Sequence, residues 1–293
     1  MEQFFIYLAL AIFGAVFGSF AGATVWRLRA YQLEEDKNNK EPYDKSEYKR
    51  LKRLTGRTLV KDRSCCLECG YELQWYDLIP ISSSVALKGK CRRCHHRIGA
   101  LEPLIELSMA AFFVLSYILW PGGVIGVLGM IHFGLWLAAG VAMAILFVYD
   151  LKWYLVPDNT VIILGIIGLA ITVVSALEAP SAGAVAMTAI GSMAILGGLY
   201  AVLYAVSKGK WVGLGDVELG FALALVLVDW QLAIVALFLA NLVGCIVVIP
   251  GLVTKKLQRT SHVPFGPMLI TGTVLAWFFG WGILRWYLGL AGM

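Results

Sequence analysis

The sequence predicts an all-α polytopic membrane protein with about eight transmembrane helices and a small cytoplasmic zinc-ribbon-like domain between the first two. Three observations support this fold class. Of 293 residues, 59% are apolar and only 15% are charged, a balance typical of membrane proteins. Apolar runs long enough to cross a bilayer, roughly 20 residues each, recur along the chain. One charged stretch interrupts them, and it holds five of the six cysteines.

Eight apolar segments are candidate transmembrane helices. They cover residues 4–26, 104–120, 124–149, 160–177, 184–206, 217–228, 232–253 and 268–284. The sixth is too short to span a bilayer unaided, so we expect it to tilt, to borrow the preceding glycine-rich turn or to lie buried among its neighbours. The first is too long for a secretory signal and has neither a basic n-region nor a small-residue cleavage pattern. We therefore expect it to be a retained helix.

Basic residues at the segment ends indicate how the chain crosses the membrane. With the N-terminus outside, the alternating segments place eight of them inside: Arg27, Arg29, Lys152, Lys208, Lys210, Lys255, Lys256 and Arg259. Only Arg285 falls near the opposite face. This asymmetry is expected of cytoplasmic loops, so both termini are predicted to lie outside. The net charge of +5 follows from this bias; membrane lipid is the expected surrounding, and no nucleic-acid partner is predicted.

The charged stretch divides the chain into three predicted domains. Residues 1–26 are the first transmembrane helix, 27–100 a cytoplasmic domain and 101–293 the transmembrane core. The first half of the cytoplasmic domain, 33–61, is rich in Glu, Asp, Lys and Asn. It is therefore either a solvated helix or a flexible insertion, and we assign it no chemistry.

Two C-x-x-C pairs in the second half of this domain have the spacing of a metal site. Four thiolates at this spacing can surround one zinc ion tetrahedrally, and the metal can fold a small domain that has little apolar core. The candidate ligands are Cys66, Cys69, Cys91 and Cys94. Disulfides and unrelated free thiols are the alternatives, and a reducing cytoplasm disfavours disulfides. Four thiolates leave no open coordination position, so the zinc is expected to be structural.

Neighbouring residues leave the exact ligand set open. Cys65 competes with Cys66, and His95 or His96 could replace a sulfur. Cys245 lies in an apolar segment, where packing is the simpler explanation.

Acidic residues inside apolar segments are costly and indicate function. Asp150 ends the third segment, and Asp216 stands in the run Gly-Leu-Gly-Asp at the start of the sixth. The predicted topology puts both at the same membrane face. Gly213 and Gly215 would let the backbone turn, so that another helix or an extended substrate can approach. If the helices pack together, the two carboxyls can meet.

Two carboxyls within hydrogen-bond reach do not both ionise readily, so they share one proton. Such a pair can act as a base on water and as an acid on a leaving amine, which is aspartyl protease chemistry. Taken singly, each Asp has a simpler explanation, as a helix cap or a partner of Lys152. Asp158 is explained as a helix-start residue. Glu218, two residues past Asp216, is a candidate auxiliary acid.

At these positions the sequence resembles the type IV prepilin peptidase family of GxGD membrane aspartyl proteases. The resemblance covers nearly the whole chain except 33–61. Its signatures occur in the family's order: Gly18-Ser19-Phe20 with Arg27-Leu28, the cysteine pairs with Asp77, Pro80 and Lys88-Gly89-Lys90-Cys91, Pro103-Leu104-Ile105-Glu106, Asp150 before Pro157-Asp158, Gly213-Leu214-Gly215-Asp216, and Pro264-Phe265-Gly266-Pro267. A lone GxGD would be weak evidence, whereas six ordered signatures are hard to obtain by chance.

The resemblance implies an inner-membrane aspartyl endopeptidase that removes the basic leader of a type IV prepilin or pseudopilin after a Gly, at the cytoplasmic face. It implies Asp150 and Asp216 as the catalytic residues. Four further residues are expected to support them: Gly213, Gly215, Glu218 and Lys152. Many family members also methylate the new N-terminal amine with S-adenosylmethionine, so we expect this second activity on the resemblance alone. No glycine-rich fingerprint identifies residues that bind the methyl donor.

The sequence departs from the family's pattern at three positions. Glu218 stands where Lys is usual, which places a negative charge beside the proposed pair. Leu67 and Leu78 stand where Pro and Asn are common, and neither change removes a zinc ligand. The Gly-Ser-Phe run of the first segment has two explanations, close helix packing and a role in substrate or donor binding.

Two other functions are compatible with a polytopic membrane protein. A transporter would carry protons or cations on its acids, but we find neither inverted repeats nor midplane acids in the sequence. A non-catalytic scaffold of a secretion or pilus system would keep the fold without turnover, and an intact Asp pair argues against it. The sequence therefore favours the peptidase.

Overall fold

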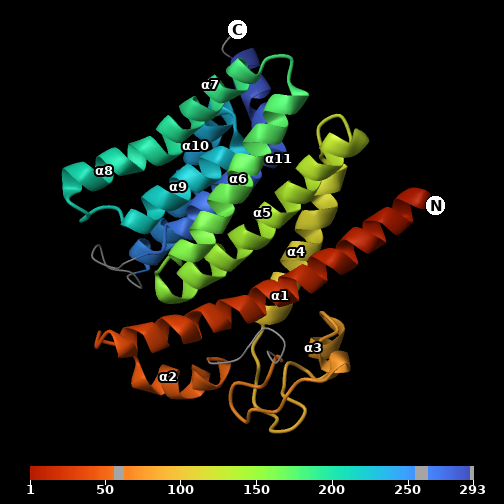
Figure 1. The fold of residues 1–293 in the computed structure, drawn as a ribbon, viewed down its shortest axis with the longest axis vertical. Coiled ribbons are helices and arrows are strands. Elements are labelled where there is room, and N and C mark those ends of the chain that lie inside the picture. The colour runs from red at the N-terminus through yellow and green to blue at the C-terminus, as the bar shows by residue number, and fades with distance from the viewer. Residues whose placement is uncertain (56–62, 255–262, 291–293) are drawn as a thin grey trace. The chain divides into compact units, whose positions relative to one another are not determined.

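A computed structural model describes residues 1–55, 63–254 and 263–290, which are mostly helical and contain no named β-strand (Figure 1). The chain forms two compact units, Met1–Leu115 and Ser116–Met293. Among the described residues, seven helices are long and apolar enough to cross a membrane. The predicted all-α membrane fold is therefore confirmed.

In the first unit, α1 (Glu2–Asn38) packs closely against α4 (Leu101–Ile118). Glycines permit the close approach. A Cβ on Gly14 would lie 2.5 Å from the Met109 carbonyl oxygen, and a Cβ on Gly18 would lie 2.7 Å from the Cα of Glu106. Helix packing therefore explains the glycine of the Gly-Ser-Phe run.

Helix α1 is longer than the apolar segment that predicted it. It continues to Asn38, because the more polar stretch that follows includes the good helix formers Ala, Leu, Gln, Glu and Arg. Loss of apolar character thus marks the end of the membrane segment and not the end of the helix. The extension contributes two of the four buried residues of a small core, Ala30, Leu33, Leu51 and Leu54.

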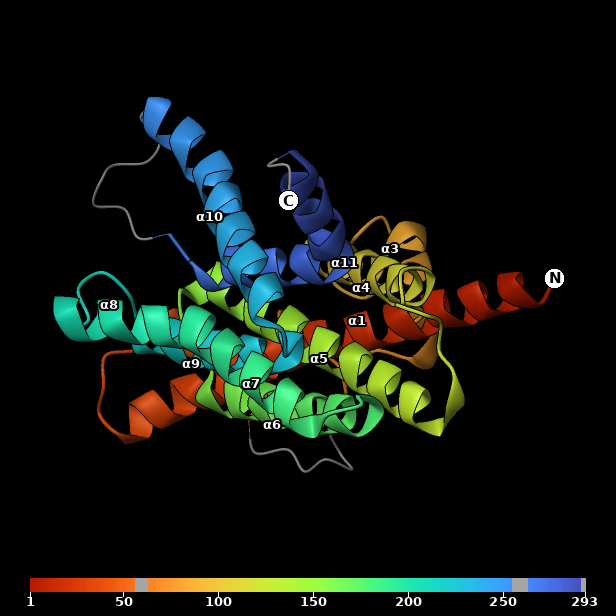
Figure 2. The same ribbon diagram turned by 90° about the horizontal axis from the view of Figure 1, so that it is seen from above.

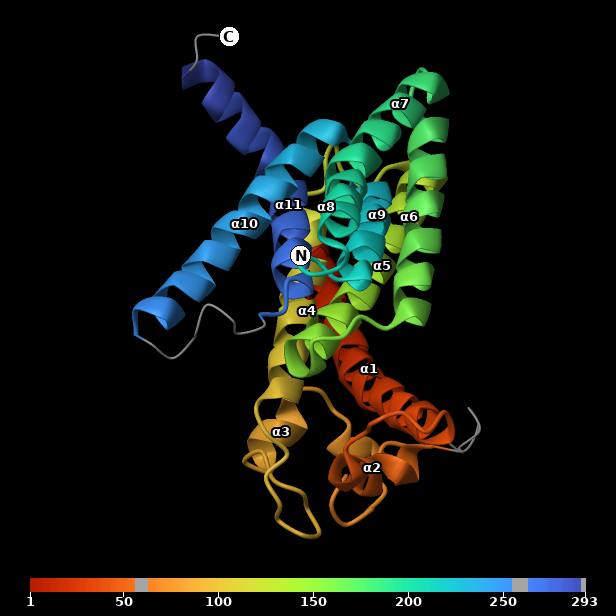
Figure 3. The same cartoon turned by 90° about the vertical axis from the view of Figure 1, so that its left-hand side faces the viewer.

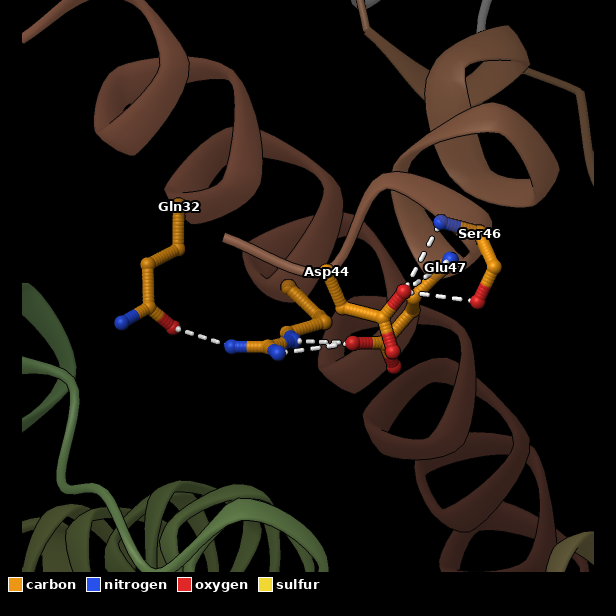
Figure 4. A network of polar contacts seen from close by, with 5 residues as sticks. Gln32, Asp44, Ser46 and Glu47 are labelled. Atoms are coloured by element: carbon orange, nitrogen blue, oxygen red, sulfur yellow. Dashed lines mark hydrogen bonds and ion pairs between the residues drawn. The ribbon is translucent and has the colours of Figure 1, made fainter. Parts of the chain in front are cut away.

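Helix α2 (Lys45–Leu51) and the 3-10 turn η1 (Lys52–Leu54) fold back on this extension. Polar contacts around Arg29 of α1 hold them there (Figure 4). The Arg29 guanidinium donates to Glu47 Oε2 of α2, with Nη2 at 2.6 Å and Nε at 2.9 Å. The Asp44 side chain caps α2 by accepting hydrogen bonds from the backbone N–H groups of its first turn.

The described part of the charged insertion 33–61 is thus helical in two places and carries a packed contact of its own. Residues 56–61 lie outside the described residues.

The cysteine-bearing loops of the first unit contain little regular structure. Their elements are η2 (Trp75–Asp77), α3 (Ser82–Ala86) and two isolated bridges, Cys65 with Glu72 and Lys90 with Arg97. The side chain of Asp77 is buried and pairs with Arg92 at 2.8 Å. A domain with so small an apolar core needs another source of stability, such as a metal.

The second unit is a helical bundle in which α7, a π-helical turn and α8 form one continuous span. Its elements are α5 (Gly126–Trp153), α6 (Asp158–Glu178), α7 (Ala182–Met193), η3 (Ala194–Gly198), α8 (Leu199–Ser207), α9 (Leu214–Leu227), α10 (Trp230–Val253) and α11 (Gly266–Leu290). The basic residues Lys208 and Lys210 follow α8, and Lys152 lies in the last turn of α5. Lys255, Lys256 and Arg259 lie outside the described residues.

Helix α9 corresponds to the sixth predicted segment, and it is as short as expected. Its 14 residues rise about 21 Å, less than the roughly 30 Å of a hydrocarbon core. Neighbouring helices surround it, as Figures 1 and 3 show for α6, α7 and α8. Thr172 of α6 and Ser192 of α7 donate to its backbone carbonyls, at 3.1 and 2.9 Å. A Cβ on Gly220 would lie 2.5 Å from the Leu196 carbonyl oxygen.

Helices α10 and α11 cross at small residues and diverge on either side of the crossing (Figures 2 and 3). A Cβ on Gly272 of α11 would lie 2.5 Å from the Ala236 carbonyl oxygen and 2.6 Å from the Ala240 nitrogen of α10. The backbones therefore touch at this point, which fixes where the N-terminal end of α11 lies.

We expect Gly220→Ala to destabilise the protein by about 1–3 kcal/mol, because the added methyl group must displace backbone atoms of the π-helical turn. Gly165→Ala in the neighbouring α6 is the matched control, since nothing lies within 4 Å of a Cβ there. Thermal unfolding of the purified proteins in detergent compares the two. Equal melting temperatures for both variants would contradict the packing of α9 described here.

Candidate functional site

Asp150 lies in the last turn of α5 and is buried, with 5% of its surface exposed. The helix ends at Trp153, because Tyr154 adopts a left-handed conformation with φ of 57° and its N–H donates to the Asp150 carbonyl oxygen at 2.8 Å. The Asp150 side chain has a hydrogen-bond partner of its own. Its Oδ2 accepts a hydrogen bond of 3.0 Å from the backbone N–H of Gly266, the first residue of α11.

Gly266 fits against Asp150 because it has no side chain. A Cβ at this position would lie 2.6 Å from Asp150 Oδ2 and 3.3 Å from Leu219 Cδ2 of α9. Three helices, α5, α9 and α11, therefore meet at this glycine. The contact gives a physical reason for the glycine of the Pro-Phe-Gly-Pro run, to which sequence reasoning assigned no role.

Asp216 lies in the first turn of α9 and is partly buried. The backbone of Gly213, which precedes the helix, forms a hydrogen bond to its carboxylate. Gly215 brings this turn close to the loop between α5 and α6, because a Cβ on it would lie only 3.0 Å from the Cβ of Val156. Gly215 thus allows a close approach, whereas a Cβ on Gly213 would meet only Asp216 Oδ2, at an ordinary contact distance of 3.7 Å.

The two aspartates lie close enough for the charge of one to act on the other. They come from segments far apart in the chain, and the buried meeting point of α5, α9 and α11 brings them together. Tyr200 of α8 is also within electrostatic range of Asp216, and its ring lies 5.4 Å from that of Phe265. Sequence reasoning missed Tyr200, since a tyrosine in an apolar segment carries no distinguishing signal.

Two other predicted residues, Glu218 and Lys152, each follow one of the aspartates by two positions. Glu218 is exposed. The Lys152 ammonium lies 5.3 Å from the centroid of the Trp153 ring. Asp158 is the first residue of α6, in agreement with its interpretation as a helix-start residue.

The four predicted zinc ligands converge in the first unit. The Sγ atoms of Cys66, Cys69, Cys91 and Cys94 all lie within 4.8 Å of one another. The Cys66 to Cys94 and Cys69 to Cys91 separations are 3.8 and 3.9 Å. A tetrahedral zinc with bonds of about 2.3 Å separates its sulfur ligands by about 3.8 Å. The four thiols could therefore hold a metal with little rearrangement.

The alternatives to this ligand set lie elsewhere. Cys65 forms a backbone bridge with Glu72, and His96 Nε2 lies 3.7 Å from Glu68 Oε1. Cys245 is exposed on α10. Burial raises the pKa of the Cys66 thiol to about 12, so a metal must displace a proton there.

Comparisons with known proteins agree along most of the chain. Residues 12–120 match the bacterial Peptidase A24 N-terminal domain, and residues 137–249 match the type IV leader peptidase family. A protein of Aeromonas salmonicida is 31% identical over 97% of this chain and 94% of its own length. One of Bacillus subtilis is 30% identical over 80% of this chain and 88% of its own.

A protein of Pseudomonas aeruginosa is 29% identical over 80% of this chain and 77% of its own length. All three relatives bear the name prepilin leader peptidase/N-methyltransferase. No solved structure matches the chain.

Proposed function

Because this chain belongs to the type IV leader peptidase family, we propose that it is a multi-pass inner-membrane endopeptidase that removes the leader of type IV prepilins or pseudopilins. The names of its relatives support this function. The structural observation that carries it is the convergence of Asp150 and Asp216, held at the buried junction of three helices.

In the proposed reaction the two carboxyls share one proton. The ionised carboxylate takes a proton from a water molecule, whose oxygen attacks the carbonyl carbon of the scissile bond, while the neutral carboxyl donates its proton to the carbonyl oxygen. Breakdown of the tetrahedral intermediate breaks the C–N bond and protonates the leaving nitrogen. The products are a leader with a new carboxyl group and a mature pilin with a free N-terminal amine.

The residues around the pair have positioning roles in this proposal. The Gly266 N–H holds one oxygen of Asp150 in a fixed direction, which leaves the other oxygen for water or substrate. The two glycines, Gly213 and Gly215, add no side chains to the turn before α9, which leaves room for an extended peptide to reach Asp216; at Gly215 the turn already lies close to Val156. Lys152 and Glu218 remain candidate supporting residues.

The substrate's own chemistry favours an active site at the cytoplasmic face. A prepilin carries a basic leader followed by an apolar helix, so its helix can lie in the bilayer while the leader stays solvated inside. We accordingly propose residues 1–26 as the first membrane helix, 27–100 as a cytoplasmic domain and 101–293 as the protease core, with both termini outside.

A second activity, methylation of the new N-terminal amine with S-adenosylmethionine, is part of the proposal because the relatives are named N-methyltransferases. In that reaction the amine lone pair attacks the donor's methyl carbon, the carbon–sulfur bond breaks, and its electron pair remains on sulfur. The amine loses one proton.

We further propose that the ion held by the four thiols is a structural zinc. Four sulfur ligands suit zinc and leave no open position for water. The zinc would therefore stabilise the small domain and take no part in hydrolysis.

Substituting either Asp150 or Asp216 by Asn should reduce prepilin cleavage by at least about a hundredfold, because the pair loses its base or its acid. Cleavage is measured on a co-expressed prepilin, with membrane levels of the enzyme checked in parallel. Asp158→Asn serves as the control, since Asp158 only begins α6, and it should leave processing intact. Unimpaired processing by both variants of the pair would reject the assignment.

Purified protein should contain about one zinc per chain. Cys66→Ser should lower that content, whereas Cys245→Ser on the exposed surface of α10 should not. Because zinc must displace the proton of the buried Cys66 thiol, its affinity should fall as the pH falls. Metal analysis of the two variants, and of wild-type protein dialysed at several pH values, tests these two expectations. A folded, zinc-free wild-type protein would contradict the proposal.

Mature pilin from cells that carry the enzyme should have a singly methylated N-terminal amine. Mass measurement of the N-terminal peptide decides this, with pilin from cells lacking S-adenosylmethionine-dependent modification as the mass reference. An unmodified amine would remove the methyltransferase half of the proposal and leave the peptidase half in place.

A further inference from the structure

Tyr200 carries a buried hydroxyl that the proposed hydrolysis does not use. It lies in the first turn of α8, directly after the π-helical turn, and only 5% of its surface is exposed. Its hydroxyl oxygen is buried and has no hydrogen-bond partner among the residues that the structure describes. An unsatisfied buried hydroxyl costs about 1–3 kcal/mol, and a phenylalanine ring would fill the same space without that cost. Packing alone therefore does not explain the hydroxyl.

Two polar neighbours of this hydroxyl have hydrogen bonds of their own. Asn241 of α10 lies near it but forms no hydrogen bond with it. The Asn241 Nδ2 donates instead to the Leu237 carbonyl oxygen at 2.7 Å. The carboxylate of Asp216, which lies within electrostatic range of Tyr200, is hydrogen-bonded to the backbone of Gly213. The described part of the chain thus leaves the Tyr200 O–H without an acceptor.

Tyr200 belongs to the same junction as the two aspartates. Its helix packs against α9, which carries Asp216 in its first turn. Its ring centroid lies 5.4 Å from that of Phe265, and the next residue, Gly266, donates its N–H to Asp150. A neutral hydrogen-bond donor therefore lies beside the acid pair, in the part of the bundle where the proposed cleavage takes place.

The carbonyl oxygen of the scissile bond is the acceptor that suits this donor. In the proposed reaction that oxygen receives a proton from the neutral carboxyl of the pair, which occupies one of its two lone pairs. The second lone pair is open to another donor. Negative charge builds on the oxygen as the water adds, so a donor fixed in a water-poor site stabilises the transition state more than the ground state.

We propose that Tyr200 is a third catalytic residue, whose hydroxyl donates a hydrogen bond to the carbonyl oxygen of the scissile bond. This inference rests on the peptidase half of the proposed function. As the water oxygen bonds to the carbonyl carbon, the π electrons of the C=O bond move to the carbonyl oxygen, and the Tyr200 hydrogen bond strengthens. The phenol keeps its own proton throughout, so the proton transfers of the acid pair are unchanged. The substrate thus supplies the acceptor that the described residues do not.

Steady-state cleavage of a purified prepilin by the full-length protein in detergent tests the inference. Tyr200→Phe removes only the hydroxyl and keeps the ring against Phe265. It should lower kcat at least about tenfold, because one transition-state donor is lost, while KM changes by less than about twofold. Tyr204→Phe is the matched control. It lies one turn later on the same helix, where its ring is beside Gly209, and it should leave both constants unchanged.

Two further measurements separate this role from a structural or purely electrostatic one. Tyr200→Phe should melt no lower than wild type, because it removes an unsatisfied polar group. The shape of its pH–rate profile should match that of wild type, because the phenol transfers no proton. An unchanged kcat, a lower melting temperature in step with the loss of activity, or a shifted pH optimum with full kcat at that optimum would each overturn the assignment.

Asp150→Asn, measured on the same substrate, separates this inference from the proposed function itself. Loss of cleavage in Asp150→Asn together with a reduced kcat in Tyr200→Phe would support the role of Tyr200. Loss of cleavage in Asp150→Asn with full cleavage in Tyr200→Phe would overturn that role alone. Full cleavage in Asp150→Asn, or no cleavage by the wild-type protein, would overturn the peptidase proposal, and the role of Tyr200 with it.

Discussion

A carboxylate that lies among apolar helices is unfavourable unless the backbone supplies a hydrogen bond, and this constraint shapes the second unit. Asp150 obtains that bond from the N–H of Gly266, the first residue of α11. The start of α11 must therefore lie beside the end of α5. The crossing of α11 with α10 at Gly272 must in turn be placed so that the start of α11 can reach that position. The arrangement of three helices thus follows from the needs of one side chain.

The same junction explains why small residues occur at particular points in the unit. Gly266 is fixed by the oxygen of Asp150, Gly215 by Val156, and Gly220 by the backbone of the π-helical turn. Each lets its own backbone approach a neighbouring carboxylate, side chain or backbone more closely than a Cβ at that position would allow. These contacts hold the end of α5 and the start of α9 in place, as the acid–base chemistry proposed for Asp150 and Asp216 requires.

Much of this organisation could be predicted from the sequence, because apolar length and cysteine spacing are local properties. The long spans, the short segment before Val228 and the four converging thiols all followed from them. The end of α1 at Asn38 could not be predicted in this way, since polar residues can continue a helix outside the membrane. The hydrogen bond from the Gly266 N–H to Asp150 could not be predicted either, because its partners are 116 positions apart and a glycine N–H carries no chemical signature.

The shortness of α9 also bears on how the protein is made. A segment of 14 residues offers too little apolar length to partition into lipid by itself, so its entry must be assisted. Its principal contacts, α6 and the span that contains α7 and the π-helical turn, precede it in the chain, and they are synthesised before it leaves the ribosome. A groove with carbonyl-binding hydroxyls from Thr172 and Ser192 is therefore available to receive it. The order of the helices along the chain makes biogenesis of the GxGD segment a docking step onto finished protein and not an independent insertion.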